Sequence, residues 1–347
     1  MRALTYEGPH DIRVAEVPDP APRDVDSAVI RVTAAGICGS DLHIYDGHGF
    51  SPDTGYCVGH EAIGEVVEAG SGVRRFAVGD RVLVPASAGC LTCEPCRRGW
   101  VAGCETLLGG CYGLGHSLPG SQAEAVAVPA ADLNLQAMPD SMSADAALTL
   151  TDNLPTAWYG ARRARIEPGD TVAVVGLGPV GMLSVMSAQA MGAGRVLGVD
   201  LVAERRAAAA AIGAEPVEGD DPRGSLIEMT AGRGAEVVLE AVGADETIRL
   251  AIDVAGRAGR VSVVGVNQNM NFPMRMVLAQ LKELEFAIGL CSVQRELPTL
   301  MRLIEAGRIR PESVVTHHLP LSEGAEAYRL FATREAGVGK VSLDPTR

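Results

Sequence analysis

The sequence has little positive charge and lacks any apolar run long enough to cross a membrane. Lysine and arginine contribute 30 residues against 43 from aspartate and glutamate, so the formal net charge is −13 at pH 7. This deficit argues against nucleic acid and anionic membrane surfaces as partners. Since the N-terminus also lacks an apolar leader segment, we expect a cytoplasmic protein that acts without a membrane.

Internal repeats and low-complexity linkers are missing as well, while the composition is that of a folded globular protein. Hydrophobic residues make up 47% of the 347 positions and charged residues 21%. These fractions disfavour intrinsic disorder. At roughly 150 residues per domain, this length corresponds to about two domains.

The pattern of apolar residues divides the chain into two parts. Up to about residue 153, short alternating runs such as residues 28–32 and 64–68 predict a mostly antiparallel β domain. From residue 171 onward, apolar strand-length runs alternate with helical stretches, which indicates βαβ units around a parallel sheet. The predicted strands are 171–175, 195–200, 236–240, 260–264 and 285–290, and the predicted helices include 179–191 and 203–212. Beyond residue 290, helix and β pieces return that could rejoin the first domain.

Eight cysteines are present, and four of them crowd into fifteen residues in the pattern C-x2-C-x2-C-x7-C. These four are Cys90, Cys93, Cys96 and Cys104. A reducing compartment disfavours disulfides, so the cluster predicts a metal site. Four thiolates complete the tetrahedral coordination of zinc, which predicts a structural ion that braces a loop. A thiol redox switch and simple buried thiols are the alternatives. The pattern assigns no role to Cys57, Cys111 or Cys291.

A second set of metal-ligand types lies earlier in the chain. Cys38 is followed some twenty residues later by His60 and Glu61. Zinc accepts a thiolate, an imidazole and a carboxylate, and three protein ligands with one open position form a catalytic zinc site. The spacing alone leaves open that His60 is a buried histidine of the core.

The segment GLGPVG at residues 176–181 matches the pattern G-x-G-x-x-G. It directly follows the predicted strand 171–175 and opens a helix, so its backbone can approach a pyrophosphate at the helix N-terminus. Asp200 closes the next strand nineteen residues after Gly181. A carboxylate there accepts hydrogen bonds from both ribose hydroxyls and repels a 2′-phosphate, which favours NAD(H) over NADP(H). The candidate cofactor-binding residues are Gly176, Gly178, Pro179, Val180, Gly181, Asp200, Arg205, Val242, Val264 and Gly265.

Two arginines follow Asp200 closely. Arg205 and Arg206 could weaken the preference for NAD(H), because a guanidinium can accommodate a 2′-phosphate. The alternative is that both belong to a solvated helix face.

The chain resembles the zinc-containing medium-chain alcohol dehydrogenases almost from end to end, and these features occur in the same order as in that family. The matching stretches are GICGSDLH at residues 36–43, GHEAIG at 59–64, VGDRV at 78–82, the four-cysteine lobe and the nucleotide-binding segment. The resemblance implies an α/β protein with two domains. Residues 1–153 and 291–347 would form a GroES-like, mostly β catalytic domain with a zinc lobe at about 88–105. Residues 154–290 would form a Rossmann domain, a doubly wound parallel sheet that binds NAD.

The same resemblance implies a catalytic zinc site. Cys38 and His60 match two of its ligands. Asp152, in the stretch TDNLPTA at residues 151–157, stands where relatives carry a cysteine or an aspartate as the third ligand. Glu61 matches a carboxylate beside the zinc, which in some relatives coordinates the ion directly or during ligand exchange.

Ser40 and His43 match the residues that move the substrate proton in this family. Ser40 matches the hydroxyl that contacts the substrate oxygen, and His43 matches the end of a relay through the nicotinamide ribose. A zinc ion held by one thiolate, one carboxylate and one neutral imidazole carries no net formal charge and acts as a Lewis acid on an alcohol. The implied reaction is reversible hydride transfer between an alcohol and NAD, which gives a carbonyl compound and NADH.

Several substrate branches remain open. The stretches GSQAEAVAVP at residues 120–129 and TDNLPT at 151–156 resemble formaldehyde dehydrogenases, whereas DLHIY at 41–45 is similar to polyol and threonine dehydrogenases. The compact length favours a secondary alcohol, a ketone or a polyol. A nucleotide-binding protein without catalysis on the same fold is the alternative of another class. The family also implies a homodimer or homotetramer, with the strand near residues 285–290 pairing across a two-fold axis.

Overall fold

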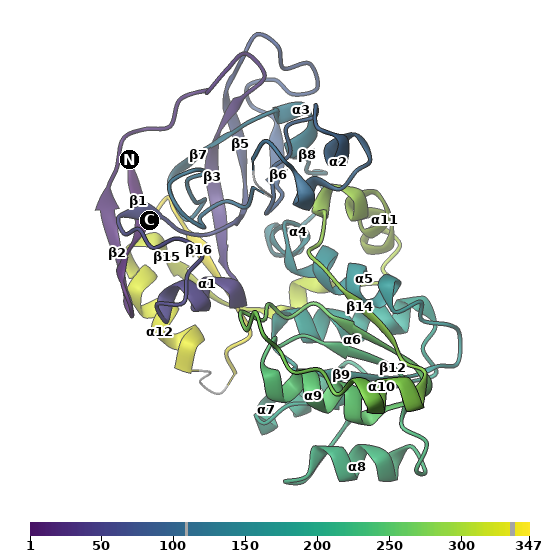
Figure 1. Ribbon diagram of the computed structural model, residues 1–347. Helices are drawn as coiled ribbons and strands as arrows, with labels where there is room; N and C mark the ends of the chain where they lie inside the picture. Colours follow the sequence, from purple (N-terminus) through teal and green to yellow (C-terminus); the bar gives the residue numbers. More distant parts are fainter. Residues whose placement is uncertain (108–109, 334–336) are drawn as a thin grey trace. The chain divides into compact units, whose positions relative to one another are not determined.

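The computed structural model describes residues 1–107, 110–333 and 337–347 (Figure 1). These residues form two compact units. The first consists of Met1–Pro155, Ser292–Arg302 and Pro311–Arg347, and the second of Thr156–Cys291 and Leu303–Arg310. The resemblance implies a β domain that includes all of residues 291–347, whereas Cys291 and Leu303–Arg310 group with the second unit. The boundary between Arg302 and Leu303 falls within one helix, so the pattern of apolar residues could not predict it.

The first unit is built on β strands, and its mostly antiparallel architecture is confirmed. A three-stranded sheet has the order β2-β1-β4, and a seven-stranded sheet has the order β15-β16-β3-β5-β6-β8, with β7 also paired to β3. Neighbouring strands are antiparallel except β15 and β16, which run parallel. The strands are β1 (Arg2–Gly8), β2 (Asp11–Glu16), β3 (Ala28–Ile37), β4 (Tyr56–Cys57), β5 (Glu61–Ala69), β6 (Arg81–Val84), β7 (Ala125–Val128), β8 (Gln136–Ala137), β15 (Val315–Pro320) and β16 (Lys340–Asp344).

Helices accompany these sheets, and the longest of them continues into the second unit. They are α1 (Gly39–Tyr45), α2 (Glu94–Arg97), α3 (Ala131–Asn134), α4 (Ala144–Leu150), α11 (Val293–Glu305) and α12 (Gly324–Thr333), with 3₁₀ turns η1 (Val101–Gly103), η2 (Pro311–Val314) and η3 (Leu321–Glu323). The core of the unit contains Ile30 and Val32 of β3, Val66 of β5 and Tyr328 and Phe331 of α12. The C-terminal helix α12 therefore packs into the same core as the central strands β3 and β5.

The second unit contains a parallel six-stranded sheet with the order β11-β10-β9-β12-β13-β14 (Figure 1). The strands are β9 (Thr171–Val175), β10 (Arg195–Val199), β11 (Glu215–Pro216), β12 (Ala235–Glu240), β13 (Ala255–Val263) and β14 (Glu285–Ile288). The helices are α5 (Asn153–Arg163), α6 (Pro179–Met191), α7 (Ala203–Ala211), α8 (Pro222–Met229), α9 (Asp245–Val254) and α10 (Met276–Lys282). The strand order reverses between β9 and β12, and ligands bind doubly wound sheets at such a switch point.

Apolar residues cover both faces of this sheet, because alternate strand residues point to opposite sides. Val172 and Val174 share a core with residues of α5, α6 and α7, while Ala173 and Val175 share another with residues of α8 and α9. The predicted doubly wound sheet is confirmed. Within the described residues, no helix is long and apolar enough to span a bilayer.

Candidate metal centres and cofactor site

The turn from β3 into α1 positions Cys38 and Ser40. Cys38 caps α1 in an extended conformation, and its backbone N–H donates to Asp41 Oδ2 at 2.9 Å. In return, the Asp41 N–H donates to the Cys38 carbonyl at 3.1 Å. This tight turn leaves the Ser40 hydroxyl 3.3 Å from Cys38 Sγ.

Pairing of β5 with β3 brings His60 to the same place, since Glu61 lies opposite Gly36 in the antiparallel ladder. Nδ1 of His60 lies 3.3 Å from Asp41 Oδ1. Nε2 lies 3.4 Å from Ser40 Oγ and 3.7 Å from Asp152 Oδ2. A carboxylate at one ring nitrogen orients a histidine whose other nitrogen binds a metal. Nε2 is therefore the atom available as a ligand.

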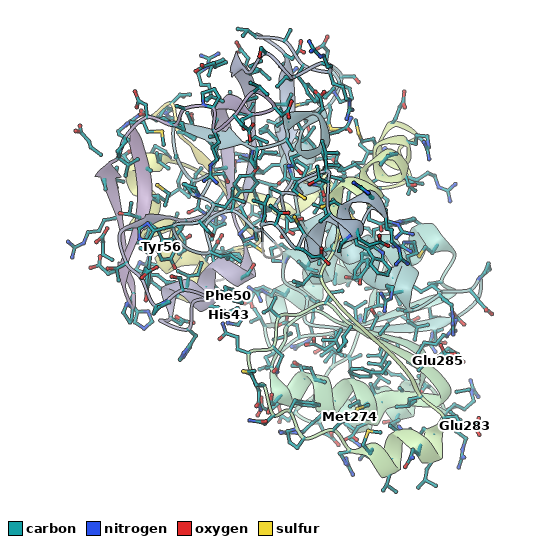
Figure 2. The ribbon with its side chains drawn as sticks, turned by 45° about the horizontal axis from the view of Figure 1, so that its top comes forward. His43, Phe50, Tyr56, Met274, Glu283 and Glu285 are labelled. Carbon is teal, nitrogen blue, oxygen red and sulfur yellow. The ribbon has the colours of Figure 1, made fainter. Side chains whose placement is uncertain are left out.

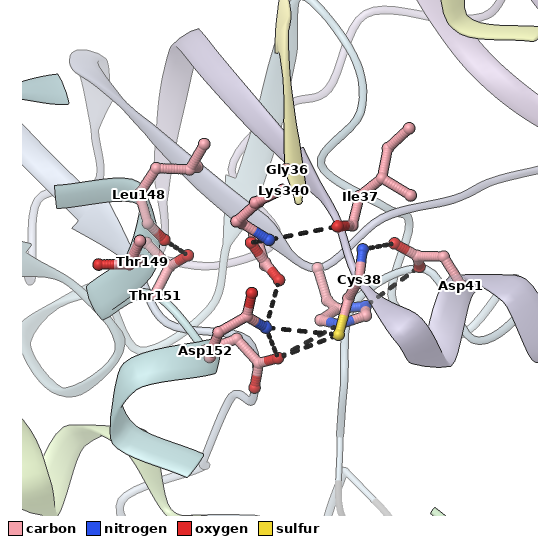
Figure 3. Close-up of polar contacts among 12 residues, drawn as sticks. Gly36, Ile37, Cys38, Asp41, Leu148, Thr149, Thr151, Asp152 and Lys340 are labelled. Atoms are coloured by element: carbon pink, nitrogen blue, oxygen red, sulfur yellow. Dashed lines mark hydrogen bonds and ion pairs between the residues drawn. The ribbon is translucent and has the colours of Figure 1, made fainter. Parts of the chain in front are cut away.

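Asp152 enters from the connection between α4 and α5 (Figure 3). The preceding carbonyl, that of Thr151, accepts a hydrogen bond from Ala86 N–H at 2.8 Å. Asp152 Oδ2 lies 3.4 Å from Cys38 Sγ. Asn153 Nδ2 donates to Asp152 Oδ2 at 3.0 Å and to Glu61 Oε1 at 2.9 Å. One amide thus fixes both carboxylates.

We call Cys38, His60, Glu61 and Asp152 the ligand group, because each offers one ligand atom within 4.8 Å of those of the others. Tetrahedral zinc bonds to sulfur, nitrogen and oxygen place ligand atoms about 3.4–3.6 Å apart. The separations of 3.4 Å between Cys38 Sγ and Asp152 Oδ2 and of 3.7 Å between His60 Nε2 and Asp152 Oδ2 agree with that geometry. The donor set and its spacing fit a zinc ion.

Burial and neighbouring charges set the protonation of these side chains. Burial raises the pKa of the Cys38 thiol, and the carboxylate of Asp152 raises it further. Burial alone would lower the pKa of His60, but Asp41 foremost raises it well above its ordinary value. Burial alone would raise the pKa of Asp152, whereas hydrogen bonding to His60 lowers it. Because burial opposes the thiolate, a bound dication would favour the ionised form of Cys38.

Ser40 and His43 lie three residues apart on α1, and such residues share one helix face. Ser40 Oγ contacts the ligand group directly, as its distances to Cys38 and His60 show. His43 follows in the last turn of the helix and is half-buried (Figure 2). The structure therefore brings Ser40 to the metal ligands and places His43 one turn further along.

Lys340 belongs to the surroundings of the ligand group, although no sequence motif indicated it. The side chain is fully buried, forms an ion pair with Glu61 Oε2 and donates to the Ile37 carbonyl at 3.2 Å (Figure 3). It lies 303 positions from Ile37 in the chain. Only the antiparallel pairing of β16 with β3, in which Val341 and Ser342 lie opposite Ile37 and Gly36, brings it here. Long-range strand pairing of this kind leaves no local pattern.

Cys111, to which the cysteine pattern assigns no role, lies near the ligand group. Burial raises the pKa of its thiol to about 12, and the charges of His60 and Asp152 also act on it.

The four-cysteine group, Cys90, Cys93, Cys96 and Cys104, gathers its ligand atoms within 4.8 Å of one another. Cys93 N–H donates to Cys90 Sγ at 3.3 Å, and Leu107 N–H donates to Cys104 Sγ at 3.4 Å. Cys93 Sγ and Cys104 Sγ lie 4.0 Å apart. Sulfur atoms on a tetrahedral zinc ion are about 3.8 Å apart, so this group fits a closed structural site.

The thiol at the outer edge of this group ionises readily. Burial alone would raise the pKa of Cys90, but hydrogen bonds from the hydroxyls of Thr106 and Thr92 lower it to about 5. A thiolate is the form that binds zinc.

The glycine motif forms the turn from β9 into α6. Gly176 has φ +89°, and a Cβ there would lie 2.3 Å from Val242 Cγ2. A Cβ on Gly181 would lie 1.8 Å from the Gly176 carbonyl oxygen. Gly178 caps α6, and Pro179 occupies its first turn. Gly176 and Gly181 thus meet a steric requirement, and Gly178 leaves room for a pyrophosphate at the helix N-terminus.

Asp200 follows β10, the neighbouring strand, and the backbone holds its carboxylate in place. Oδ2 accepts a hydrogen bond from Leu177 N–H at 2.8 Å, and Oδ1 accepts one from Val202 N–H at 2.8 Å. Each carboxylate oxygen can accept a second hydrogen bond. The capacity needed to bind ribose hydroxyls therefore remains.

The two arginines after Asp200 differ in position. Arg205 Nη1 lies 3.9 Å from Asp200 Oδ2 and 3.8 Å from where a Gly178 Cβ would be. Arg206 instead donates to the Asp200 carbonyl at 2.8 Å and to Glu218 Oε2 at 2.8 Å. Of the two arginines, only Arg205 lies close to the glycine turn at residues 176–181.

The other candidate cofactor residues line the ends of neighbouring elements. Val180 is half-buried in the first turn of α6. Val242 follows β12, while Val264 and Gly265 follow β13. A Cβ on Gly265 would lie 2.1 Å from Gly243 N, so the two turns touch backbone to backbone. These residues lie at the carboxyl ends of strands around the switch point, where the motif also lies.

Known proteins show clear similarity to the chain. The family profile described as "Alcohol dehydrogenase GroES-like domain" matches residues 24–140, and that described as "Zinc-binding dehydrogenase" matches residues 179–306. A probable zinc-binding alcohol dehydrogenase from Mycobacterium tuberculosis is 40% identical over 347 residues, which cover 99% of this chain and 89% of the relative.

Solved structures share the fold along the whole chain. Alcohol dehydrogenase TADH from Thermus sp. ATN1 is 39% identical, with a TM-score of 0.92 and 99% of each chain covered. A protein described as a short chain alcohol dehydrogenase (rspB) from Escherichia coli CFT073, complexed with cofactor NADH, is 26% identical, with a TM-score of 0.87 and 99% of each chain covered.

Proposed function

The chain belongs to the zinc-containing medium-chain alcohol dehydrogenases, and on that premise we propose that it transfers a hydride reversibly between an alcohol and NAD(H) at a zinc ion held by Cys38, His60 and Asp152. The observation that supports this function is the ligand group with Ser40 Oγ beside it, 3.3 Å from Cys38 Sγ. Three ligand types and an adjacent hydroxyl are what alcohol activation by zinc requires.

The side chains of the site have different roles in the proposed reaction. A zinc ion bound by the ligand group would supply a Lewis acid that lowers the pKa of the alcohol. Ser40 accepts the alcohol proton and passes it toward His43, which releases it to solvent. Glu61, paired with Lys340, serves as a further carboxylate for the ion. The four-cysteine group holds a second zinc ion, which braces its loop and takes no part in catalysis.

We propose NAD(H) as the cofactor in preference to NADP(H). Bound NAD⁺ supplies the hydride acceptor, while the protein supplies its position. Asp200 would accept hydrogen bonds from the ribose hydroxyls and repel a 2′-phosphate. Leu201 and Val242 are exposed apolar side chains next to this carboxylate and the glycine turn, and they offer apolar surface to the adenine. The relative from Escherichia coli that was solved with NADH supports the same choice.

A secondary alcohol, or the corresponding ketone or polyol, is the proposed substrate class. The experiment is a panel of primary, secondary and polyhydric alcohols with NAD⁺, followed by NADH absorbance, with Cys38→Ala as the blank. We expect the highest kcat/KM among secondary alcohols or polyols. A preference for formaldehyde adducts or threonine would move the protein to another branch of the family. One zinc ion per chain and no binding of NADH would favour a non-catalytic role.

We also propose that the protein is a homodimer or homotetramer. β14 lies at the edge of the described sheet of the second unit. Ile288 and Leu290 at this strand, and Val277 and Leu281 of α10, are exposed apolar side chains. An edge strand with apolar neighbours is suited to pairing with a second copy. Light scattering on the purified protein checks this, and a monomer at micromolar concentration would contradict it.

A further inference from the structure

We propose that Gln122 and Tyr328 are positioning residues of the metal centre: this buried pair holds the Cys38 turn and the His60 segment at ligating distance. The inference depends on the proposed zinc site, and its test therefore reads metal and not turnover. Neither residue belongs to the ligand group or to the metal and nucleotide motifs, although Gln122 lies in the stretch at residues 120–129. We refer to them as the Gln122–Tyr328 pair.

The amide of Gln122 supports the carboxylate that contacts both ligands. Nε2 donates to the Gly36 carbonyl at 2.9 Å and to Asp41 Oδ2 at 3.3 Å. The same Asp41 carboxylate accepts from Cys38 N–H at 2.9 Å and lies 3.3 Å from His60 Nδ1. Asp41 has no exposed surface, so its oxygens rely on such donors for hydrogen bonds. The amide thus acts on both metal ligands through one carboxylate.

The backbone and stem of Gln122 fix the segment before His60. Gln122 N–H donates to the Val58 carbonyl at 3.0 Å. Gly59 has φ +90°, and a Cβ there would lie 2.3 Å from Gln122 Cγ. The side chain therefore packs directly on Gly59, in a space that only glycine leaves free. Movement of Gln122 would release the residue that precedes a ligand.

Tyr328 fixes the direction in which this amide points. The side chain comes from α12, has no exposed surface, and its hydroxyl donates to Gln122 Oε1 at 2.9 Å. A tyrosine hydroxyl that donates to the amide oxygen leaves the NH₂ group to face Gly36 and Asp41. Burial raises the pKa of Tyr328 well above its usual value, so the hydroxyl keeps its proton. The C-terminal helix is thus linked through Tyr328, Gln122 and Asp41 to His60.

The test measures release of metal from the intact protein. Zinc lost to the chelator dipicolinate is followed over time, and the cobalt-substituted protein is followed by the thiolate-to-cobalt absorption of the ligand group. Loss of an outer-shell partner costs about 10–100-fold in metal affinity. We therefore expect Tyr328→Phe and Gln122→Met to release the ligand-group metal about tenfold or more faster and to shift the cobalt band.

A matched control and a double variant separate positioning from general stability. The hydroxyl of Tyr56, another buried tyrosine, has no hydrogen-bond partner among the described residues, so Tyr56→Phe should retain metal as the wild type does. Because Tyr328 acts through Gln122, the double variant Tyr328→Phe/Gln122→Met should release metal no faster than Gln122→Met alone. Additive effects would instead indicate two independent structural contributions and would overturn the proposal.

The remaining outcomes are equally decisive. Folded variants that release ligand-group metal at the wild-type rate would refute the inference and leave the metal centre itself intact. If Gln122→Met fails to fold, Tyr328→Phe decides, since it removes one hydroxyl. A wild-type protein that holds zinc only in the four-cysteine group would instead refute the proposed function.

Discussion

The two metal centres of the first unit are assembled in opposite ways. The four-cysteine group draws its ligands from residues 90–104, and local amides such as Cys93 N–H point at its sulfur atoms. The ligand group draws on β3, β5 and the connection between α4 and α5, and Lys340 of β16 supports it. A centre made within one loop can form wherever that loop folds. A centre made from distant strands exists only when the whole β domain is in register.

Charge distinguishes the centres as well. The ligand group is embedded among buried ionisable side chains, including Asp41 and Lys340, both without exposed surface. In the four-cysteine group, Cys90 and Cys93 are only half-buried. Four thiolates suit a permanent ion, whereas a polar pocket with mixed ligands suits an ion that exchanges a fourth ligand. Variants that affect one centre and spare the other test whether the two centres are independent.

The largest expected effect is the loss of turnover in Cys38→Ala. Removal of a ligand from a Lewis-acid site abolishes several kcal/mol of transition-state stabilisation, which is at least about a thousandfold in kcat/KM. The variant should retain one zinc ion per chain, in the four-cysteine group, and should stay folded. Elemental analysis and NADH absorbance measure both quantities. Turnover near the wild-type level would remove Cys38 from the catalytic site.

Lys340→Met should have the largest effect on stability. It leaves the Glu61 carboxyl buried without its cation, which costs about 3–5 kcal/mol in the free energy of unfolding. Urea denaturation measures this loss. A control is Arg31→Met, which breaks an exposed ion pair to another glutamate of β5, Glu65, and should cost less than about 1 kcal/mol. Equal losses in both variants would mean that burial of the Lys340 pair is unimportant.

Cys90→Ser tests the other metal centre, the four-cysteine group. Weakening a site that would be filled at a hundred times its Kd removes about 2.7 kcal/mol of stabilisation, and the Tm of a chain of this size should fall by about 4 °C. The ligand group should keep its ion, and kcat/KM below the transition should stay within about twofold of the wild type. Calorimetry and zinc analysis test this. Loss of both ions together would show that the centres are coupled.

Asp200→Asn gives the smallest expected effect. The amide oxygen can still accept one backbone hydrogen bond, but the negative charge is lost. Since a hydrogen bond to a charged group contributes about 1.5–3 kcal/mol, the preference for NAD⁺ over NADP⁺ should fall about tenfold. The ratio of kcat/KM for the two cofactors measures it. Arg206→Ala is the control, because Arg206 faces Glu218 and the Asp200 carbonyl; an unchanged ratio in Asp200→Asn would argue against Asp200 as the selective residue.

Features that depend on neighbouring residues could be predicted from the sequence, whereas features that depend on distant strands could not. Strand 171–175 and helix 179–191 were predicted correctly and correspond to β9 and α6, because apolar runs and glycine turns are local signals. The spacing of the four cysteines is local too. Cys38 and His60 could be paired only through the family resemblance, since their approach requires β3 and β5 in register. No local pattern indicates the roles of Gln122, Tyr328 or Lys340, whose partners lie 81, 206 and 303 positions away.

Anomalous diffraction at the zinc edge tests the central claim most directly. The account predicts two peaks in each chain: one bounded by Cys38 Sγ, His60 Nε2 and Asp152 Oδ2, and one inside the four-cysteine group. A single peak in the four-cysteine group of a fully active protein would contradict it.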